Sequence, residues 1–323
     1  MLSKRNFTTY LTAFIIISLL NFFLPRMMPG DPLMAIYGED ALVQMTPELQ
    51  VHLVERFALN KPLWKQLGAY FRGLVRGDLG HSYYYNAPVM KVILGRLPWT
   101  ILLVGSCMVI STIFGIILGI ESGWRRGSKI DKSLLTGLMV LGGFPDFFLG
   151  ILLLLLFSVT LGLFPLAGAV TPYADLSGAA LLLDGLKHLF LPLGALTLCH
   201  IGGGYLLTRN TMITVMQEPY MLTARAKGLS NSTVKYHHAG RNSMLPVITR
   251  TGIWLGRVVT GTFLVEMVFS YPGLGCLTYD ALVARDYPVL QGVLLVVAVF
   301  VLAANFSVDL IYPKLDPRVS YAR

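Results

Sequence analysis

Residues 99–120 read WTILLVGSCMVISTIFGIILGI, a run without a charged side chain. A helix needs about 20 apolar residues to cross the roughly 30 Å hydrocarbon core of a bilayer, so this run predicts a transmembrane helix. The whole chain has the same character, because 54% of its 323 residues are hydrophobic and only 13% are charged. A soluble protein of this length carries more polar surface, whereas lipid accepts apolar side chains. The sequence therefore predicts an all-α, polytopic membrane protein.

Further apolar runs lie on both sides of this one. The first is uncharged from Asn6 to Pro25, and no small-residue cleavage site follows it, which favours a retained anchor over the alternative of a cleaved signal peptide. The third run is interrupted by Pro145 and Asp146. Together the runs predict six transmembrane helices, at about residues 6–25, 99–120, 134–160, 189–212, 247–268 and 289–312.

The loops between these runs differ in their content of Lys and Arg, which are enriched on the cytoplasmic side of membrane proteins. Loops 161–188 and 269–288 hold only Lys187 and Arg285, respectively. Both termini are therefore predicted to be cytoplasmic, and the net charge of +9 is explained without a nucleic-acid partner. The basic residues on the predicted cytoplasmic side include Lys4, Arg5, Arg125, Arg126, Lys129, Lys132, Arg225, Lys227, Lys235, Arg241, Lys314, Arg318 and Arg323.

This topology divides the chain into four parts. The second part is an external insertion in which Thr46 and Pro62 can each begin an amphipathic helix, the latter closed by Gly77 and Gly80. An interfacial helix pair and a docking rim for a substrate-delivery protein explain this insertion equally well. The parts are the N-terminal tip with the first helix (1–28), the insertion (29–97), a five-helix core (98–313) and a cytoplasmic tail (314–323).

The predicted cytoplasmic segment 213–245 is too long for a tight turn and too polar to span a bilayer. Pro219 suits the first turn of a helix, and Gly228 suits the position just past its C-terminus. Residues 230–232 can cap a second short helix that ends before Pro246. Two short helices joined by a glycine turn are therefore expected on the cytoplasmic face, where they could couple mechanically to a partner.

Residues 220–229 of this segment read YMLTARAKGL and are followed by Arg241-Asn242 and Leu245-Pro246. This pattern resembles the coupling loop of ABC importer permeases, and most closely the dipeptide, oligopeptide and nickel family. The resemblance covers nearly the whole chain. The other matching motifs are MPGDP (28–32), GDLGHS (77–82) with Pro88-Val89, EMVFSYPGLG (266–275), RDYP (285–288) and DPR (316–318). Two departures from the wider importer pattern are Leu222 and Thr223 in place of an opening acidic residue, and a longer gap from Gly228 to Leu245-Pro246.

The resemblance implies a type I transmembrane domain of an ABC importer in a bacterial inner or plasma membrane. In such an importer two homologous permease subunits form the pathway, two ATP-binding subunits contact the coupling helices, and an extracytoplasmic binding protein delivers substrate. The chain has no GxxxxGK[ST] phosphate-binding loop, so ATP and Mg would be bound by the partner subunits, and neither a cofactor nor a catalytic residue is expected here. The residues that the resemblance assigns to coupling are Tyr220, Thr223, Ala224, Arg225, Ala226, Lys227 and Gly228.

Three polar residues, Asp146, His200 and Arg257, fall at similar depth in three predicted spans. An ionisable group inside a membrane usually has a partner and faces protein or water. We expect Asp146 and Arg257 to pair, or to line the cavity through which a peptide passes; an ion pair that only fixes helix packing is the alternative. A metal site at His200 and Cys199 is not expected, because neighbours on a helix point about 100° apart.

Peptide import is the function that the resemblance favours, and import of nickel or a metal complex by the same architecture is the alternative. A secondary transporter coupled to an ion gradient is a more distant alternative, supported only by Asp146 beside Pro145 at an interrupted span. Uptake that survives ATP depletion but collapses with the proton gradient would support it. A purely structural membrane protein fits poorly with the polar residues inside the spans.

Overall fold

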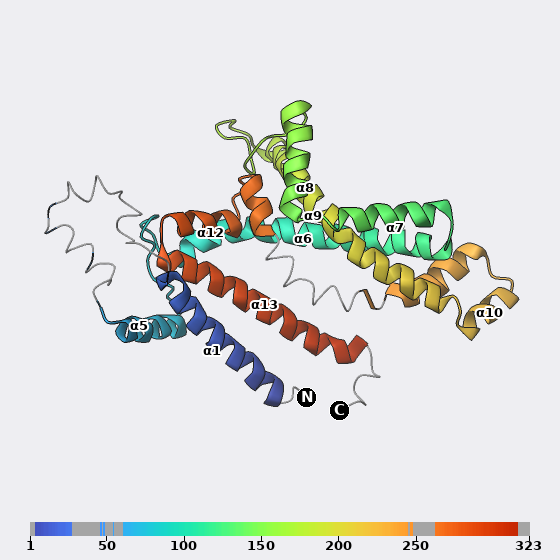
Figure 1. The fold of residues 1–323 in the computed structure, drawn as a ribbon, viewed down its shortest axis with the longest axis horizontal. Coiled ribbons are helices and arrows are strands. Elements are labelled where there is room, and N and C mark those ends of the chain that lie inside the picture. The colour runs from blue at the N-terminus through green and yellow to red at the C-terminus, as the bar shows by residue number, and fades with distance from the viewer. Residues whose placement is uncertain are drawn as a thin grey trace. The chain divides into compact units, whose positions relative to one another are not determined.

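Figure 1 shows the fold of the chain in a computed structural model. The structure describes residues 4–27, 46, 48, 54, 61–244, 246–247 and 262–315, with side chains between residues 8 and 306. Within these residues the regular elements are helices, and the only β-type pairing is an isolated bridge between His81 and Pro88. The predicted all-α class is confirmed.

The helices occur in the following order along the chain. They are α1 (Lys4–Arg26), α5 (Leu63–Arg76), α6 (Val89–Trp124), α7 (Lys129–Leu141), α8 (Asp146–Leu153) with its π-helical continuation η1 (Leu154–Thr160), α9 (Gly178–Val215), α10 (Pro219–Ala226), the π-helix η2 (Thr233–Gly240), α12 (Leu274–Val283) and α13 (Tyr287–Leu315).

Four helices of the described part, α1, α6, α9 and α13, are long and apolar enough to cross a bilayer. The pair formed by α7 and α8–η1 makes a fifth if it is one broken span. The predicted span 247–268 lies mostly outside the described residues, which include only Val247 and its helical end, 262–268. The multi-pass architecture is thus confirmed, while the number of six spans and their orientation stay predictions.

The predicted third span is not one straight helix. Its two halves, Lys129–Leu141 and Asp146–Thr160, are bent by 99°. The bend follows from the sequence between them, because Gly142 and Gly143 weaken the helix and Pro145 disfavours a helical conformation in Phe144. Pro145 then becomes the N-terminal cap of α8, with a φ of −61° and a ψ of 140°. The interruption was predicted from sequence, but its size was not.

The chain folds into two compact units, residues 1–100 with 272–302 and residues 101–271 with 303–323. Each unit therefore combines segments that are far apart in the sequence. The four-part division expected from the sequence follows the sides of the membrane rather than packing within the chain, and it stays a prediction.

In the first unit, α1 and α13 lie side by side (Figure 1), and the Asn21 amide donates a hydrogen bond to the Gln291 carbonyl oxygen at 2.7 Å. Helix α5 begins after Pro62 and ends at Gly77, which has a φ of +72°, as the sequence predicts. Two of the sequence motifs also meet here. Ser82 Oγ and the Tyr84 N–H both donate to the Asp286 carboxylate, at 2.5 Å and 3.0 Å.

In the second unit, α6 crosses α9 at a series of glycines. Gly115, Gly119 and Gly123 recur at every fourth position, and so lie on one face of α6. A Cβ atom added to Gly119 would lie 2.5 Å from Thr208 Cβ and 2.8 Å from the Tyr205 carbonyl oxygen. Small residues at this spacing let two membrane helices approach until their backbones touch. A second close approach occurs at Gly202 of α9, because a Cβ there would lie 3.0 Å from the Leu138 carbonyl oxygen of α7.

We predict that Gly119→Ala destabilises the protein by about 1–3 kcal/mol, the usual cost of overpacking a filled contact. The methyl group would force α6 away from the α9 backbone. Thermal unfolding of the purified protein in detergent measures the effect. Gly105→Ala on the same helix is the control, since a Cβ there meets nothing within 4 Å. Equal melting temperatures for the two variants would contradict the proposed contact.

Candidate functional site

The predicted hairpin between the fourth and fifth spans is present in the structure. Pro219 is the first residue of α10, and the chain turns at Gly228, whose φ is +71°. This left-handed conformation suits glycine, because it has no Cβ. The Gly228 N–H donates to the Arg225 carbonyl oxygen at 3.0 Å, and η2 follows after the turn. Two helices joined by a glycine turn are thus confirmed. The predicted end of the second helix before Pro246 is wrong, because residues 231–244 are helical and so are residues 246–247.

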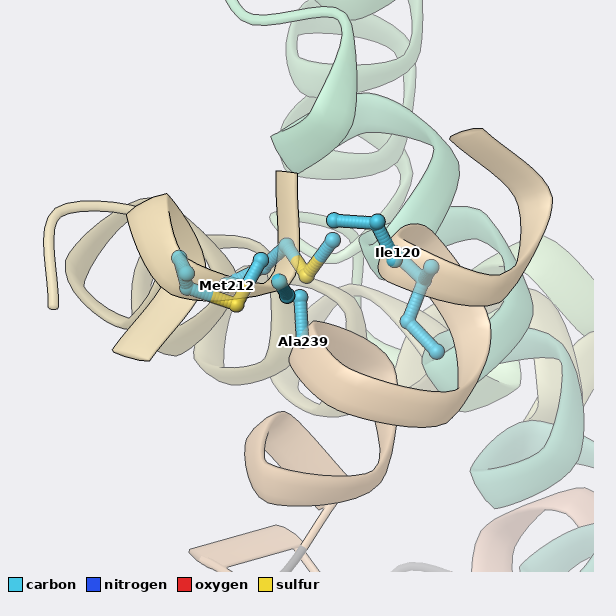
Figure 2. Close-up of a cluster of buried hydrophobic side chains, with 6 residues drawn as sticks. Ile120, Met212 and Ala239 are labelled. Atoms are coloured by element: carbon cyan, nitrogen blue, oxygen red, sulfur yellow. The ribbon is translucent and has the colours of Figure 1, made fainter. Parts of the chain in front are cut away.

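The inner face of the hairpin is apolar and packs against the ends of α6 and α9. Figure 2 shows the side chains of Ile120, Met212 and Ala239 gathered in one cluster. Each member is 5% exposed or less, so the packing is continuous from one helix to the next. The cluster consists of Ile120 from α6, Met212 from α9, Met221 and Ala224 from α10, and Val234 and Ala239 from η2.

The outer face of the hairpin carries most of the residues assigned to coupling from the sequence. Ala224 is the exception, because it is 5% exposed and belongs to the packing cluster. Leu222, which was not in the predicted set, is 74% exposed on this outer face. Tyr220 is 40% exposed, and its hydroxyl accepts a hydrogen bond from the Asn242 amide at 2.8 Å. The exposed members of the predicted set are Tyr220, Thr223, Arg225, Ala226, Lys227 and Gly228.

One carboxylate joins η2 to α6. Glu121 accepts hydrogen bonds from the Lys235 ammonium and from the Tyr236 hydroxyl. The Lys235 side chain is 10% exposed and the Glu121 side chain 26%, so the pair is partly shielded from water. Arg125 lies on the open side of the same carboxylate, with its Nε 3.7 Å away and its own side chain 52% exposed. Polar contacts therefore reinforce the apolar attachment of the hairpin.

A second carboxylate, which is buried, joins α7 to α9. Asp131 is 2% exposed and accepts two hydrogen bonds from the Arg209 guanidinium, at 2.6 Å and 2.8 Å. It also accepts from Ser122 and from the Gly127 N–H, and Ser122 Oγ lies 2.6 Å from the Tyr205 hydroxyl. A buried charge needs this complete set of partners to offset its loss of water. The network fixes α6, α7 and α9 to one another near the base of the hairpin.

Two of the three polar residues predicted inside the spans come together. His200 Nε2 lies 3.2 Å from Asp146 Oδ2, with the two side chains 20% and 19% exposed. Arg257 lies outside the described residues, so its pairing with Asp146 stays a prediction. The Cys199 thiol lies beside the Asp146 carboxyl and also donates to the Phe144 carbonyl oxygen, with its Sγ 3.7 Å from that oxygen. The described residues include no group of three or more His, Cys, Asp or Glu that could hold a metal ion.

Sequence reasoning did not single out Glu121, Asp131 or Arg209, or the glycine series of α6. The series leaves a visible signal, since its spacing of four residues predicts a close helix contact. The pairing of Glu121 with Lys235 leaves no such signal, because the two residues are 114 positions apart. Only the folded chain identifies them as partners.

The long apolar helices, the polar pair between them and a hairpin packed on the ends of α6 and α9 define a class: a helical membrane protein with a projecting helical hairpin. The sequence profile described as "Binding-protein-dependent transport system inner membrane component" matches residues 88–321. The chain belongs to this family, which confirms the resemblance drawn from its motifs, and it is a multi-pass protein of the bacterial inner membrane.

Two relatives match over nearly their full length. The chain is 35% identical over 336 residues to the di/tripeptide transport system permease protein DppB of Pseudomonas aeruginosa, covering 99% of this chain and 98% of the relative. It is 36% identical over 340 residues to the dipeptide transport system permease protein DppB of Escherichia coli K12, with the same coverage of each chain. Both relatives are named for peptide transport.

We predict that Glu121→Gln weakens the attachment of η2 to α6 by about 1–2 kcal/mol, because the Lys235 ammonium loses its carboxylate partner. Hydrogen exchange of the backbone amides in residues 233–240 should accelerate roughly 5–30-fold. The control is Arg125→Gln, which removes the exposed partner of the same carboxylate and should change little. Unchanged exchange in Glu121→Gln would show that the apolar cluster alone holds the hairpin.

Proposed function

We propose that this chain is the permease subunit of an ATP-driven peptide importer and forms half of its translocation pathway. The observation that carries the proposal is the hairpin at residues 219–240, with an inner face packed on α6 and α9 and an outer face left exposed. The names of the two relatives support a peptide as the cargo rather than nickel or a metal complex.

The proposed importer divides its work among subunits. A second, homologous permease completes the pathway, two ATP-binding subunits carry the nucleotide and Mg, and an extracytoplasmic binding protein delivers the peptide. This chain makes and breaks no bond, so its contribution is mechanical. ATP-driven closure of the ATP-binding subunits moves the hairpin, the spans tilt, and the pathway opens outward to accept the peptide. Return to the inward-open state releases the peptide.

The attachment of the hairpin supports this mechanical role. A displacement of α10 reaches α9 through Met221 and Met212, and reaches α6 through Ile120. The contact of Glu121 with Lys235 also couples η2 to α6, so a displacement of η2 reaches the same helix. Closely packed side chains transmit strain because protein interiors have low compressibility. The exposed side chains of Leu222 and Tyr220 are available to pack against an ATP-binding subunit. Arg225 and Lys227 are exposed on the same helix end and could contact polar groups of that subunit.

We predict that Leu222→Arg removes roughly 90% or more of ATP-dependent peptide uptake by the reconstituted importer. A positive charge at the centre of an apolar contact, beside Arg225 and Lys227, would be buried without a partner. The ATP-binding subunits should also no longer co-purify with the permease. Tyr173→Arg is the control, because it places the same charge on a fully exposed aromatic position outside the hairpin. Normal uptake and normal co-purification in Leu222→Arg would refute the proposed coupling surface.

Asp146 and His200 are proposed to line the peptide pathway, together with Arg257. Each side chain of the Asp146–His200 pair keeps about a fifth of its surface exposed within an apolar part of the chain. Ionisable groups at such positions usually face a water-filled cavity or another polar group. A peptide carries an ammonium and a carboxylate group, so a carboxylate and an imidazole in the wall could meet its two ends in turn.

We predict that Asp146→Asn lowers uptake of a dipeptide with a free amino terminus about tenfold more than uptake of its N-acetylated counterpart. The lost carboxylate can stabilise an ammonium group but has little effect on an amide. Initial rates over a range of peptide concentrations measure this. Asp175→Asn, in the exposed loop between η1 and α9, is the control. An equal loss for both peptides would assign the pair to helix packing instead.

A further inference from the structure

The first unit contains an open pocket of about 530 Å³ at the C-terminal end of α1. It is built from α1, α5, the loop at 78–86 and the start of α13. That loop carries part of a motif singled out in the sequence, GDLGHS, for which the coupling mechanism has no use. The lining residues that matter here are Arg26, Lys61, Tyr70, Asp78, Tyr83 and Gln291.

Arg26 is positioned in this pocket with part of its hydrogen-bonding capacity unused. Its Nη1 donates to the Phe22 carbonyl oxygen at 2.8 Å, its Nε donates to Gln66 Oε1 at 3.1 Å, and its Cζ lies 3.7 Å from the centre of the Phe22 ring. A guanidinium has five N–H donors, so three remain. Among the residues that the structure describes, none offers Arg26 a carboxylate.

Lys61 is the second cation of the pocket. The Gln66 amide that contacts Arg26 also donates to the Lys61 carbonyl oxygen, at 2.8 Å, and so links the backbone of Lys61 to the Arg26 side chain. The Lys61 side chain has no hydrogen bond or ion pair within the described part of the chain. Asp78 is the one carboxylate among the lining residues, and its Oδ1 already accepts a hydrogen bond from the Gly80 N–H at 2.9 Å.

The tyrosines of the pocket add no negative charge. Burial raises the pKa of the Tyr83 hydroxyl to about 12, and burial also raises the pKa of the Tyr70 hydroxyl. Both phenols therefore stay neutral at physiological pH and can donate hydrogen bonds. The pocket is suited to an anion that accepts several hydrogen bonds at once.

The position of Arg26 along α1 indicates where this anion comes from. The apolar stretch Thr8–Arg26 has 19 residues, and a rise of 1.5 Å per residue gives it a length of about 28 Å, close to the thickness of the hydrocarbon core. Arg26 therefore lies at the level of the lipid headgroups. The neighbouring helix α5 has the composition of an interfacial helix, since Trp64 is 69% exposed and Lys65 lies beside its ring.

We propose that this pocket binds the phosphate group of an anionic phospholipid, with Arg26 and Lys61 as its ligands. The Arg26 guanidinium donates through its free N–H groups, whose planar arrangement matches two phosphate oxygens. Lys61 supplies a second positive charge from the rim. The bound headgroup would link α1 to α5 at the membrane surface. This site is independent of the hairpin and of the peptide pathway.

The test measures lipid retention by the assembled importer, purified in detergent after reconstitution with a mixture of phosphatidylglycerol and phosphatidylcholine. Native mass spectrometry should find phosphatidylglycerol bound in preference to phosphatidylcholine. A basic residue near an anionic membrane surface contributes about fivefold to binding, so Lys61→Gln should lower the retained phosphatidylglycerol about fivefold. Adding Arg26→Gln should lower it further.

Arg72→Gln is the matched control, because it removes the same charge from an exposed position on α5 outside the pocket. Lys61→Gln is sufficient for the test by itself, since the Lys61 side chain makes no hydrogen bond or ion pair within the described part of the chain. Retention at the wild-type level in Lys61→Gln, or an equal loss in Arg72→Gln, would overturn the proposal. Displacement of the lipid by millimolar inorganic phosphate would also overturn it, because the site would then bind a soluble anion.

Discussion

The contact on which the second unit depends is the crossing of α6 and α9 at Gly115, Gly119 and Gly123. In lipid, apolar side chains gain nothing by leaving one apolar neighbour for another, so helices associate through close packing and polar contacts. Three glycines on one face of α6 give α9 access to its backbone. The residues between the last two glycines then reach their own partners, because Ile120 packs in the hairpin cluster, Glu121 contacts Lys235, and Ser122 contacts Asp131. About two and a half turns of α6 thus organise the helix crossing, the hairpin and the buried ion pair.

If the hairpin couples the ATP-binding subunits to the spans, as proposed, this arrangement lets it transmit a mechanical displacement. A flexible loop would absorb a displacement of its tip, whereas this hairpin is seated on two helices by side chains that exclude water. The Asp131–Arg209 pair ties α7 to the same helices. Motion of the hairpin is then expected to move these helices as a group. His200 lies on α9, and its partner Asp146 is the first residue of α8. A movement of α9 would therefore shift this polar pair and alter the wall of the proposed pathway.

Much of the fold could be predicted from sequence because its signals are local. The uncharged run in α6, Pro62 before α5, and Gly228 between the two hairpin helices each specify an element within a few residues. The 99° bend was only partly predictable, since Pro145 marks a break but not its angle. The exposed face of the hairpin was predictable where a motif carries it, as at Tyr220 and Arg225, and not where it depends on which side of a helix faces inward, as for Leu222 and Ala224. Pairs such as Glu121 with Lys235 depend on long-range folding and have no counterpart in local sequence.

The bend between α7 and α8 restricts what can surround that part of the chain. Hydrocarbon offers no hydrogen bonds, so backbone at membrane depth that departs from a continuous helix must be covered by protein or must border water. The N–H groups of residues 142–144 still bond to carbonyl oxygens three or four residues earlier, but Pro145 has no N–H, so the hydrogen-bond ladder of α7 does not continue into α8. This short segment therefore cannot face lipid tails at such a depth. On this side the subunit must contact protein or water, so the shell of lipids that surrounds it is interrupted there.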